Sequence, residues 1–386
     1  MLFVLGIGLR LLSVFFSLFP LKRRVAFLSR QGKVPSVDFC MLASCLQKND
    51  PELSIVIRTS KPEQHGLGQL IRHMTSQLWY ARTSKVVVLD GYNPTVCIPH
   101  KRKGVFVIQL WHAVGAIKKF GFQSIDTAAG RSSSYARLAH MHQNYDLIIS
   151  AGPGGNAAYE EAFFYPKDYV VALGLPRIDR LLTGPSQAEL KTKFVADYPW
   201  LNNGNMNVLY APTLRPSHTK DDWQETAINS LSTALVELPI NLIVSKHPLT
   251  TLNNPDRLPA NVFVLPGHST EELLRLADVV ITDYSAIALE AGLIGSTVLF
   301  FMPDYEEYSY SPGLNIDPLH NPQLFGAIHA EDIATALHNR EYLARVQKNY
   351  SAFTQSYFEG ITPGSTERIA QLIYEHIDET YKSKTR

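Results

Sequence analysis

Short runs of β-branched and aliphatic residues alternate with helical segments along most of this chain, and that alternation constrains the fold more than any other feature. Strands are expected over 25–29, 53–58, 85–89, 105–109, 146–150 and 169–173, and then over 207–211, 240–246, 262–265, 279–282 and 298–301. Helices are expected between them, over 38–47, 68–80, 156–164, 221–238 and 270–276. Strands that alternate with helices form parallel sheets with helices on both faces. The sequence therefore predicts an α/β protein with two Rossmann-like, doubly wound domains.

A polar, turn-prone segment, Asn202-Asn203-Gly204-Asn205, separates the two sets of strands. The length of 386 residues also exceeds what one hydrophobic core usually accommodates. We predict an N-terminal Rossmann-like domain over 25–200 and a C-terminal one over 206–345, facing each other across a cleft. Helices follow over 331–346, 350–358 and 365–382, and the segment 346–386 is expected to pack across both domains. Ligands of such sheets bind beyond the carboxyl ends of the strands, so the site is expected in the cleft.

The first 20 residues are almost wholly apolar, interrupted by Arg10 and two serines, and Lys22-Arg23-Arg24 follows them. A signal peptide would need a small-residue cleavage site, which this segment lacks. Three alternatives stay open: a helix that spans the bilayer, a helix that lies on it with Arg10 and the basic cluster facing the headgroups, and a core helix. Val25 begins the first strand without a linker, which favours a domain docked on the membrane surface. We predict a membrane-associating amphipathic helix over 1–24 and a peripheral protein on the cytoplasmic side of the cell membrane.

Charge and cysteine content exclude several classes of protein. The formal net charge is +1, so no global field attracts nucleic acid, and no nucleic-acid partner is expected. Three cysteines suit neither a disulfide framework nor a zinc site. Cys40 and Cys45 fall in an apolar helical segment and are expected to be buried thiols, which favours a reducing compartment.

The segment Thr282-Asp283-Tyr284-Ser285 joins a buried strand to a helix. Asp283 and Ser285 are residue types that cap helix N-termini, and the amides from Ser285 to Ala288 are expected to be unpaired. Such a turn at the carboxyl edge of a parallel sheet can bind phosphate. The alternative is an ordinary capped helix without a ligand.

Three more polar clusters follow predicted strands. They contain His112, then Arg215 after Tyr210-Ala211-Pro212-Thr213-Leu214, and then Lys246 and His247. A single histidine after a strand more often packs or caps than reacts, but four clusters at strand ends favour one ligand site. No Asp-x-Asp pair occurs, so we predict neither a metal nor another cofactor. The charge of a pyrophosphate would then fall to Arg215, Lys246, His247 and the helix start at Ala286.

Together these clusters resemble the CDP-glycerol glycerophosphotransferase family of wall teichoic acid synthesis. The resemblance rests on Gln109-Leu110-Trp111-His112, Leu173 to Asp179, Tyr210 to Arg215, Lys246-His247-Pro248, Thr282 to Ser285, Asp304 to Tyr308 and Gly364 to Ile369. It covers roughly residues 25–373. The chain departs from the family pattern where Ala113-Val114 replaces Gly-Thr, where Ala286 replaces a second serine, and where Gly152 to Gly155 stands in place of Ser-Glu.

The resemblance implies a GT-B fold and a reaction of the short, membrane-associated primase type. A hydroxyl of the ManNAc in ManNAc-GlcNAc-pyrophosphoryl-undecaprenol would attack the β-phosphorus of CDP-glycerol and release CMP. His112 on the acceptor domain would be the base, since histidine ordinarily titrates near neutrality. His247 would stabilise charge together with Arg215 and Lys246. The donor would also be held by Thr282, Asp283, Ser285 and Ala286, with Glu290 near the ribose or glycerol.

Three alternatives to a glycerol phosphate primase stay open from the sequence. A polymerase or a CDP-ribitol transferase of the same family would share the donor turn. A nucleotide-sugar glycosyltransferase with two Rossmann domains would share the fold. A membrane-associated binding protein would have nucleotide affinity and form no product. Fold alone does not choose among them.

Overall fold

The computed structural model describes residues 2–61, 66–213, 222–245 and 259–382. The chain divides into two compact units, each with one six-stranded sheet. Unit 1 comprises Met1–Gly115, Phe120–Arg180 and Phe358–Arg386, and unit 2 comprises Ala116–Lys119 and Leu181–Tyr357. Neighbouring strands pair in parallel throughout both sheets. The predicted pair of parallel α/β domains is confirmed, whereas the cleft between them stays a prediction.

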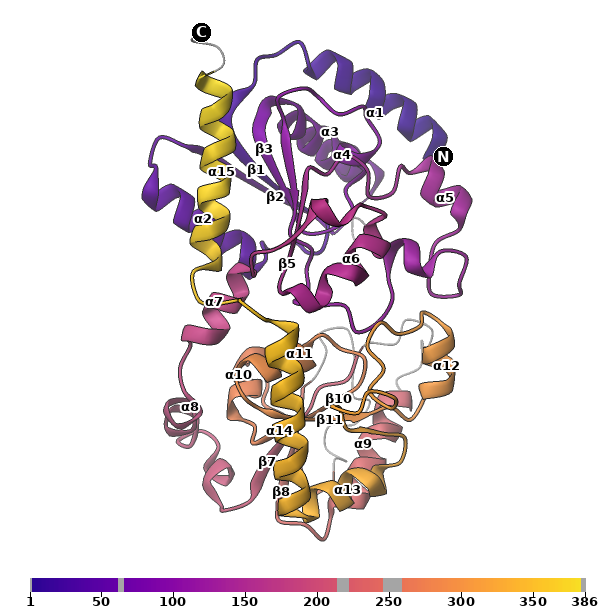
Figure 1. Ribbon diagram of the computed structural model, residues 1–386, viewed down its shortest axis with the longest axis vertical. Helices are drawn as coiled ribbons and strands as arrows, with labels where there is room; N and C mark the ends of the chain where they lie inside the picture. The colour runs from indigo at the N-terminus through magenta and orange to yellow at the C-terminus, as the bar shows by residue number, and fades with distance from the viewer. Residues whose placement is uncertain (1, 62–65, 214–221, 246–258, 383–386) are drawn as a thin grey trace. The chain divides into compact units, whose positions relative to one another are not determined.

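Unit 1 has the strand order β2-β1-β3-β4-β5-β6. Its strands are β1 (Lys22–Ser29), β2 (Ser54–Thr59), β3 (Ser84–Leu89), β4 (Phe106–Gln109), β5 (Leu147–Ser150) and β6 (Val170–Ala172). Its helices include α1 (Leu2–Phe16), α2 (Val37–Asn49), α3 (Leu67–Thr83), α4 (Pro94–Cys97), α5 (Ser133–Leu138), α6 (Asn156–Phe163) and α15 (Ser365–Lys382), and α7 (Pro176–Thr183) lies at the unit boundary (Figure 1). Strand β3 is buried along its whole length, as expected for the interior of a sheet covered on both faces.

Unit 2 has the strand order β12-β11-β10-β7-β8-β9. Its strands are β7 (Met206–Tyr210), β8 (Ile240–Val244), β9 (Val262–Phe263), β10 (Val279–Thr282), β11 (Thr297–Phe301) and β12 (Gly326–Ala327). Its helices are α8 (Gln187–Phe194), α9 (Asp222–Leu235), α10 (Thr270–Leu276), α11 (Ile287–Leu293), α12 (Tyr305–Tyr310), α13 (Ala330–His338) and α14 (Arg340–Tyr357) over the part described here. One hydrophobic cluster joins all six of these strands to α9, α13 and α14. All eleven predicted strands are present, and β12 was not predicted.

The boundary between the units lies at residue 180 rather than near residue 200. Polar contacts of the segment after Arg180 are the physical reason. Gln187 Nε2 donates to Asp278 Oδ1 over 2.9 Å, and Lys191 forms an ion pair with the same carboxylate. Arg275 donates to the carbonyl of Leu181 over 2.6 Å. Helix α8 is thus bonded to the sheet of unit 2, although the sequence assigns it to the first domain.

The C-terminal helices divide between the units. Helix α14 packs on α11 and β11 of unit 2, and α15 packs on α2 and β3 of unit 1. The predicted break at 347–349 is absent, because one helix runs from Arg340 to Tyr357. The break lies at Asn339, whose side-chain oxygen accepts from the amide of Tyr342 and starts α14. The segment 346–386 therefore contributes helical residues to each unit, and its packing across both domains stays a prediction.

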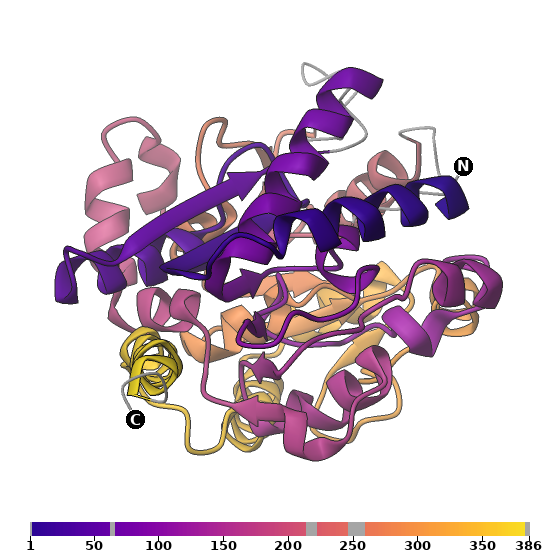
Figure 2. The ribbon, with the colours of Figure 1, turned by 90° about the horizontal axis from the view of Figure 1, so that it is seen from above.

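Helix α1 lies against unit 1 with one apolar face buried and another exposed. Leu9 and Phe16 pack against Met74 and Leu78 of α3. In Figure 2, α1 is the indigo helix that starts at the N label, and it packs on α3 and α5. The exposed apolar side chains of this segment are Phe3, Val4, Ile7, Leu11, Leu12, Val14, Phe15, Leu18 and Phe19. Among the described residues, no helix has the length and hydropathy needed to cross a membrane.

The basic segment after α1 belongs to the first strand. Strand β1 begins at Lys22, and Arg24 is buried, with its guanidinium donating to Ser54 Oγ over 3.2 Å. Arg23 forms an ion pair with Asp50 at 2.6 Å. The expectation that this cluster faces lipid headgroups is therefore wrong for the buried Arg24, and it stays a prediction for Arg23, which is partly exposed. The expectation of a buried Cys40 thiol is also wrong, because α2 exposes that side chain.

Candidate functional site

In unit 1, the candidate site is a sharp turn after β4. Gln109 is fully buried; its Oε1 accepts from the amide of Trp111 over 2.9 Å, and its Nε2 donates to the carbonyl of Gly91. Trp111 has a φ of 60°, a left-handed conformation that is costly for a bulky residue. Its indole stacks on Phe120, with ring centroids 4.7 Å apart, and packs on Phe163. Buried amide and aromatic contacts therefore hold the strained turn that presents the next residue.

The next residue is His112, which is exposed at the carboxyl end of β4. Its Nδ1 lies 3.0 Å from the backbone carbonyl of Asp90. Because a carbonyl only accepts, Nδ1 carries the hydrogen, and the neutral ring then has its lone pair on Nε2. Arg177 donates to the His112 carbonyl over 3.1 Å, and its Nε donates to Asp38 Oδ2 over 2.7 Å. Ring and backbone of His112 are both anchored, in the tautomer that a base acting through Nε2 needs.

Asp90 is a residue of this site that the sequence analysis does not identify. It follows β3 directly and is 2% exposed. Neither carboxylate oxygen has a hydrogen-bond partner at normal distance in the part of the chain described, although Ser29 lies near enough to favour the charged form. Burial is the main reason that the pKa of Asp90 is raised to about 7. A carboxylate directly after a strand is the available signal, the same criterion that identifies His112.

This shift predicts a pH-dependent effect of Asp90→Asn on stability. A carboxyl with a folded pKa of about 7 and an ordinary value of 3.8 binds its proton more tightly in the folded protein. Its stabilising contribution is complete below the ordinary value and is lost as pH rises through 7. From pH 5 to pH 8, the free energy of unfolding of the variant minus that of the wild type should rise by about 2 to 3 kcal/mol, as measured by urea unfolding. Asp168→Asn, on the exposed surface of the same unit, is the control. If the difference in unfolding free energy between the variant and the wild type were the same at both pH values, the raised pKa of Asp90 would be contradicted.

In unit 2, the predicted donor turn follows β10, which lies between β7 and β11. Thr282 and Asp283 are fully buried. Thr282 Oγ1 donates to the carbonyl of Ala211 over 2.7 Å, and Asp283 accepts from the Thr213 amide, the Thr213 hydroxyl and the Tyr284 amide over 2.6 to 2.9 Å. These two side chains bond the end of β7 to the turn. A direct contact of either one with substrate stays a prediction.

The amides at the start of α11 are only partly available. Ser285 Oγ accepts from the Ile287 amide over 3.4 Å, and the Ser285 carbonyl accepts from the Ala288 amide over 3.1 Å. The expectation that all amides from Ser285 to Ala288 are unpaired is therefore wrong, because Ser285 itself satisfies two of them. The amides of Ser285 and Ala286 make no bond to another described residue. Both residues are half-buried, as is Glu290 on the next turn.

The segment 304–308 packs against the turn at 282–285. The Tyr284 ring stacks on Tyr308 with centroids 3.8 Å apart and planes within 2°. The Tyr284 hydroxyl donates to Asp304 Oδ1 over 3.2 Å. The segments 282–285 and 304–308, which the sequence analysis treats as separate motifs, thus form one packed structure.

The three basic residues assigned to the donor lie outside the described residues. Arg215 follows β7 in the sequence, and Lys246 and His247 follow β8. Because β10, β7 and β8 are consecutive in the sheet, these residues and the 282–286 turn follow three neighbouring strands. Their roles stay predictions.

Two more motifs meet in unit 1. The carboxylate of Asp179 accepts from the amides of Gly364, Ser365 and Thr366 over 2.7 to 2.9 Å and from the Thr366 hydroxyl over 2.6 Å. It caps the start of α15, a role that the sequence analysis does not assign. Asp179 therefore bonds the segment 173–179 to the segment 364–369.

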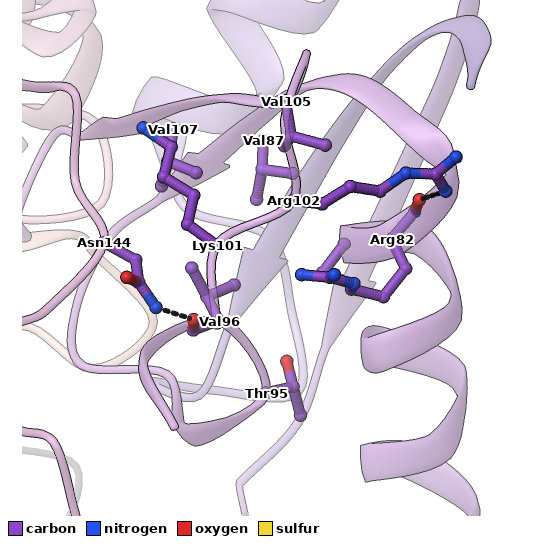
Figure 3. Close-up of a pocket in the computed structure, with 10 residues that line it drawn as sticks. Arg82, Val87, Thr95, Val96, Lys101, Arg102, Val105, Val107 and Asn144 are labelled. Carbon is purple, nitrogen blue, oxygen red and sulfur yellow. Dashed lines mark hydrogen bonds between the residues drawn. The ribbon is translucent and has the colours of Figure 1, made fainter. Parts of the chain in front are cut away.

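A small basic cavity in unit 1 is not the predicted site. Figure 3 shows Arg82, Lys101 and Arg102 at its border. Its volume of about 20 Å³ suits one water molecule. Arg82 precedes β3, and Arg102 precedes β4, so the cavity lies toward the amino ends of strands whose carboxyl ends carry Asp90 and His112.

Comparisons with known proteins match this chain to one family. The family model described as CDP-glycerol:poly(glycerophosphate) glycerophosphotransferase matches residues 11–375. The teichoic acid ribitol-phosphate primase of Bacillus spizizenii is 30% identical over 84% of each chain. The teichoic acid glycerol-phosphate primase of Bacillus subtilis is 27% identical over 63% of this chain and 62% of its own. A structure of the wall teichoic acid polymerase TagF with CDPG has a TM-score of 0.71 at 17% identity, over 98% of this chain and 97% of its own. That likeness confirms the fold.

Proposed function

Because the chain belongs to the CDP-glycerol:poly(glycerophosphate) glycerophosphotransferase family, we propose that it is a teichoic acid primase. It transfers glycerol phosphate from CDP-glycerol to the ManNAc of the undecaprenyl-pyrophosphate-linked ManNAc-GlcNAc disaccharide and releases CMP. The single observation that carries this proposal is His112, held at the carboxyl edge of its sheet in the tautomer of a base. Relatives named as primases support the choice over a polymerase.

The reaction needs a base for the incoming hydroxyl and compensation for charge on the donor. The acceptor oxygen forms a bond to the β-phosphorus, and its proton passes to Nε2 of His112. The bond from that phosphorus to the oxygen shared with the α-phosphate breaks, and CMP leaves with the electron pair. Arg215, Lys246 and His247 compensate the charge of the leaving CMP. The amides of Ser285 and Ala286 hold phosphate oxygens.

The donor is tested by CMP release from CDP-glycerol and from CDP-ribitol with the same short-chain lipid disaccharide. Turnover of CDP-glycerol alone supports the proposal. The second candidate is a CDP-ribitol donor, which the 30% identity to a ribitol-phosphate primase favours. Turnover of CDP-ribitol alone would establish that candidate and reject the first.

Ser285→Ala should raise the KM for CDP-glycerol about tenfold and change kcat less. The hydroxyl fixes the start of α11 through the Ile287 amide, and losing one hydrogen bond at such a site costs about 1.4 kcal/mol. Initial rates across CDP-glycerol concentrations measure both constants. A KM equal to that of the wild type would place the phosphate site elsewhere.

The same proposal places the protein on the cytoplasmic side of the cell membrane, where a lipid-linked acceptor resides. Leu11 and Phe15 of α1 are 68% and 54% exposed. Changing both to glutamate should lower binding to anionic vesicles at least tenfold, because apolar side chains can no longer enter the interface. Turnover of a short-chain soluble acceptor should persist, since neither residue belongs to the site.

Vesicle sedimentation measures this effect. Phe164→Glu, at an apolar residue of unit 1 that is 80% exposed, is the matched control. Equal vesicle binding by the double variant and the wild type would reject docking through α1.

A further inference from the structure

Asp90 combines two features that the proposed reaction does not yet use. Its backbone carbonyl holds the ring of His112 over 3.0 Å. Its carboxyl is buried without a hydrogen-bond partner at normal distance among the described residues. Buried polar groups without partners are rare and costly, so such a group beside a candidate base needs a physical explanation.

The groups that favour or oppose ionisation of this carboxyl are on other elements of unit 1. Ser29 ends β1, Asp38 lies on α2, and Arg177 lies on α7. Arg177 favours the ionised form of Asp90, and Asp38 opposes it. Burial is the largest of these effects. Ser29 also favours the ionised form, and of these two groups Arg177 is the cation.

That residue already has two bonding partners. Arg177 donates from Nε and from its own amide to Asp38, and from Nη1 to the His112 carbonyl. A negative charge on Asp90 would attract the same guanidinium and weaken its hold on His112. A neutral Asp90 leaves both bonds in place, as the structure has them.

We propose that Asp90 is a positioning residue for His112 that acts in its protonated form. Its carbonyl selects the Nδ1–H tautomer, and its neutral carboxyl leaves Arg177 on Asp38 and on the backbone of His112. Loss of the Asp90 proton to solvent draws Arg177 away and loosens the base. Close packing supports this arrangement: a Cβ on Gly91 would lie 2.4 Å from Gln31 Nε2 and 3.9 Å from His112 Nδ1.

The expected consequence is a fall in turnover at alkaline pH. With a pKa raised by burial to about 7, the protonated fraction of Asp90 falls about tenfold between pH 6 and pH 8. The kcat of the wild type, divided by that of Asp90→Asn at the same pH, should fall by a similar factor, because protonation of the His112 ring affects both proteins alike. Asp90→Asn is neutral at every pH, so its own kcat should not show this fall.

A readout that does not need the reaction is the ¹⁵N spectrum of histidine-labelled protein, with His112 assigned through His112→Gln. In the wild type, the His112 Nδ1 signal should change between pH 6.5 and pH 8.5 as its hydrogen bond loosens. In Asp90→Asn, any change of the His112 Nδ1 signal with pH should be the change that protonation of the His112 ring produces by itself. This comparison is independent of the proposed function, on which only the kinetic readout rests.

The outcomes separate the two proposals. A fall in kcat that persists in Asp90→Asn, or an equal loss of kcat at every pH, would overturn the positioning role. Identical His112 spectra in both proteins would also overturn it. If no donor releases CMP, the proposed function fails, and the spectra still decide the role of Asp90. Asp90→Ser, also neutral, replaces the asparagine variant if that variant does not fold.

Discussion

His112→Ala should lower the kcat of CMP release by about 10²- to 10⁴-fold and change the affinity for CDP-glycerol little. A positioned general base contributes a factor of this size to the rate. The donor is expected to bind residues of unit 2, and His112 belongs to unit 1. The Nδ1–H of His112 donates to the Asp90 carbonyl, so the lone pair that accepts the proton is on Nε2. The alanine variant lacks this lone pair.

Pre-steady-state rates and equilibrium binding of CDP-glycerol separate the two effects. His100→Ala is a suitable control, because His100 is an exposed histidine of the same unit that precedes β4 rather than following it. If binding and turnover fell by the same factor, His112 would be a donor-binding residue and not the base.

Asp179→Ala should destabilise unit 1 by about 3 to 5 kcal/mol. The carboxylate accepts four hydrogen bonds, three of them from consecutive amides at the start of α15. Removing it leaves these donors, of which those of Ser365 and Thr366 are buried, without an acceptor and removes a negative charge from a helix N-terminus. Helix α15 would loosen along its length, although Tyr374 still donates to the Leu46 carbonyl and Lys85 to the Ile377 carbonyl.

Urea unfolding at pH 7 measures this loss. Asp179→Asn keeps one acceptor oxygen, so its free energy of unfolding should fall less than that of Asp179→Ala. Glu375→Gln, on the exposed side of the same helix, should leave the free energy of unfolding almost unchanged. A loss below about 1 kcal/mol for Asp179→Ala would mean that water replaces the carboxylate at these amides.

The strands could be predicted because each buried strand is a short run of β-branched residues between turns. Strand β12 could not, since Gly326–Ala327 has two residues and shows no periodicity. The unit boundary was misplaced because it depends on long-range contacts such as Gln187 with Asp278, which local composition does not reveal. Arg24 of the basic segment after α1 was misinterpreted because it is satisfied by Ser54, a residue 30 positions away.

In the candidate site, too, some residues could be predicted from the sequence and others could not. His112 and the 282–286 turn were identified because the carboxyl ends of parallel strands are expected to carry ligands. Asp90 satisfies the same criterion, but its importance comes from the Nδ1 contact and from burial. The buried roles of Thr282 and Asp283 come from Ala211 and Thr213, which are about 70 positions distant.

The most direct test of the primase assignment is CMP release from CDP-glycerol with three acceptors. The acceptors are none, the unprimed lipid-linked ManNAc-GlcNAc disaccharide, and the same lipid already carrying one glycerol phosphate. The account predicts CMP only with the unprimed lipid, and one glycerol phosphate added per acceptor. Preferential turnover of the primed lipid would contradict it and establish an elongating enzyme of the same family.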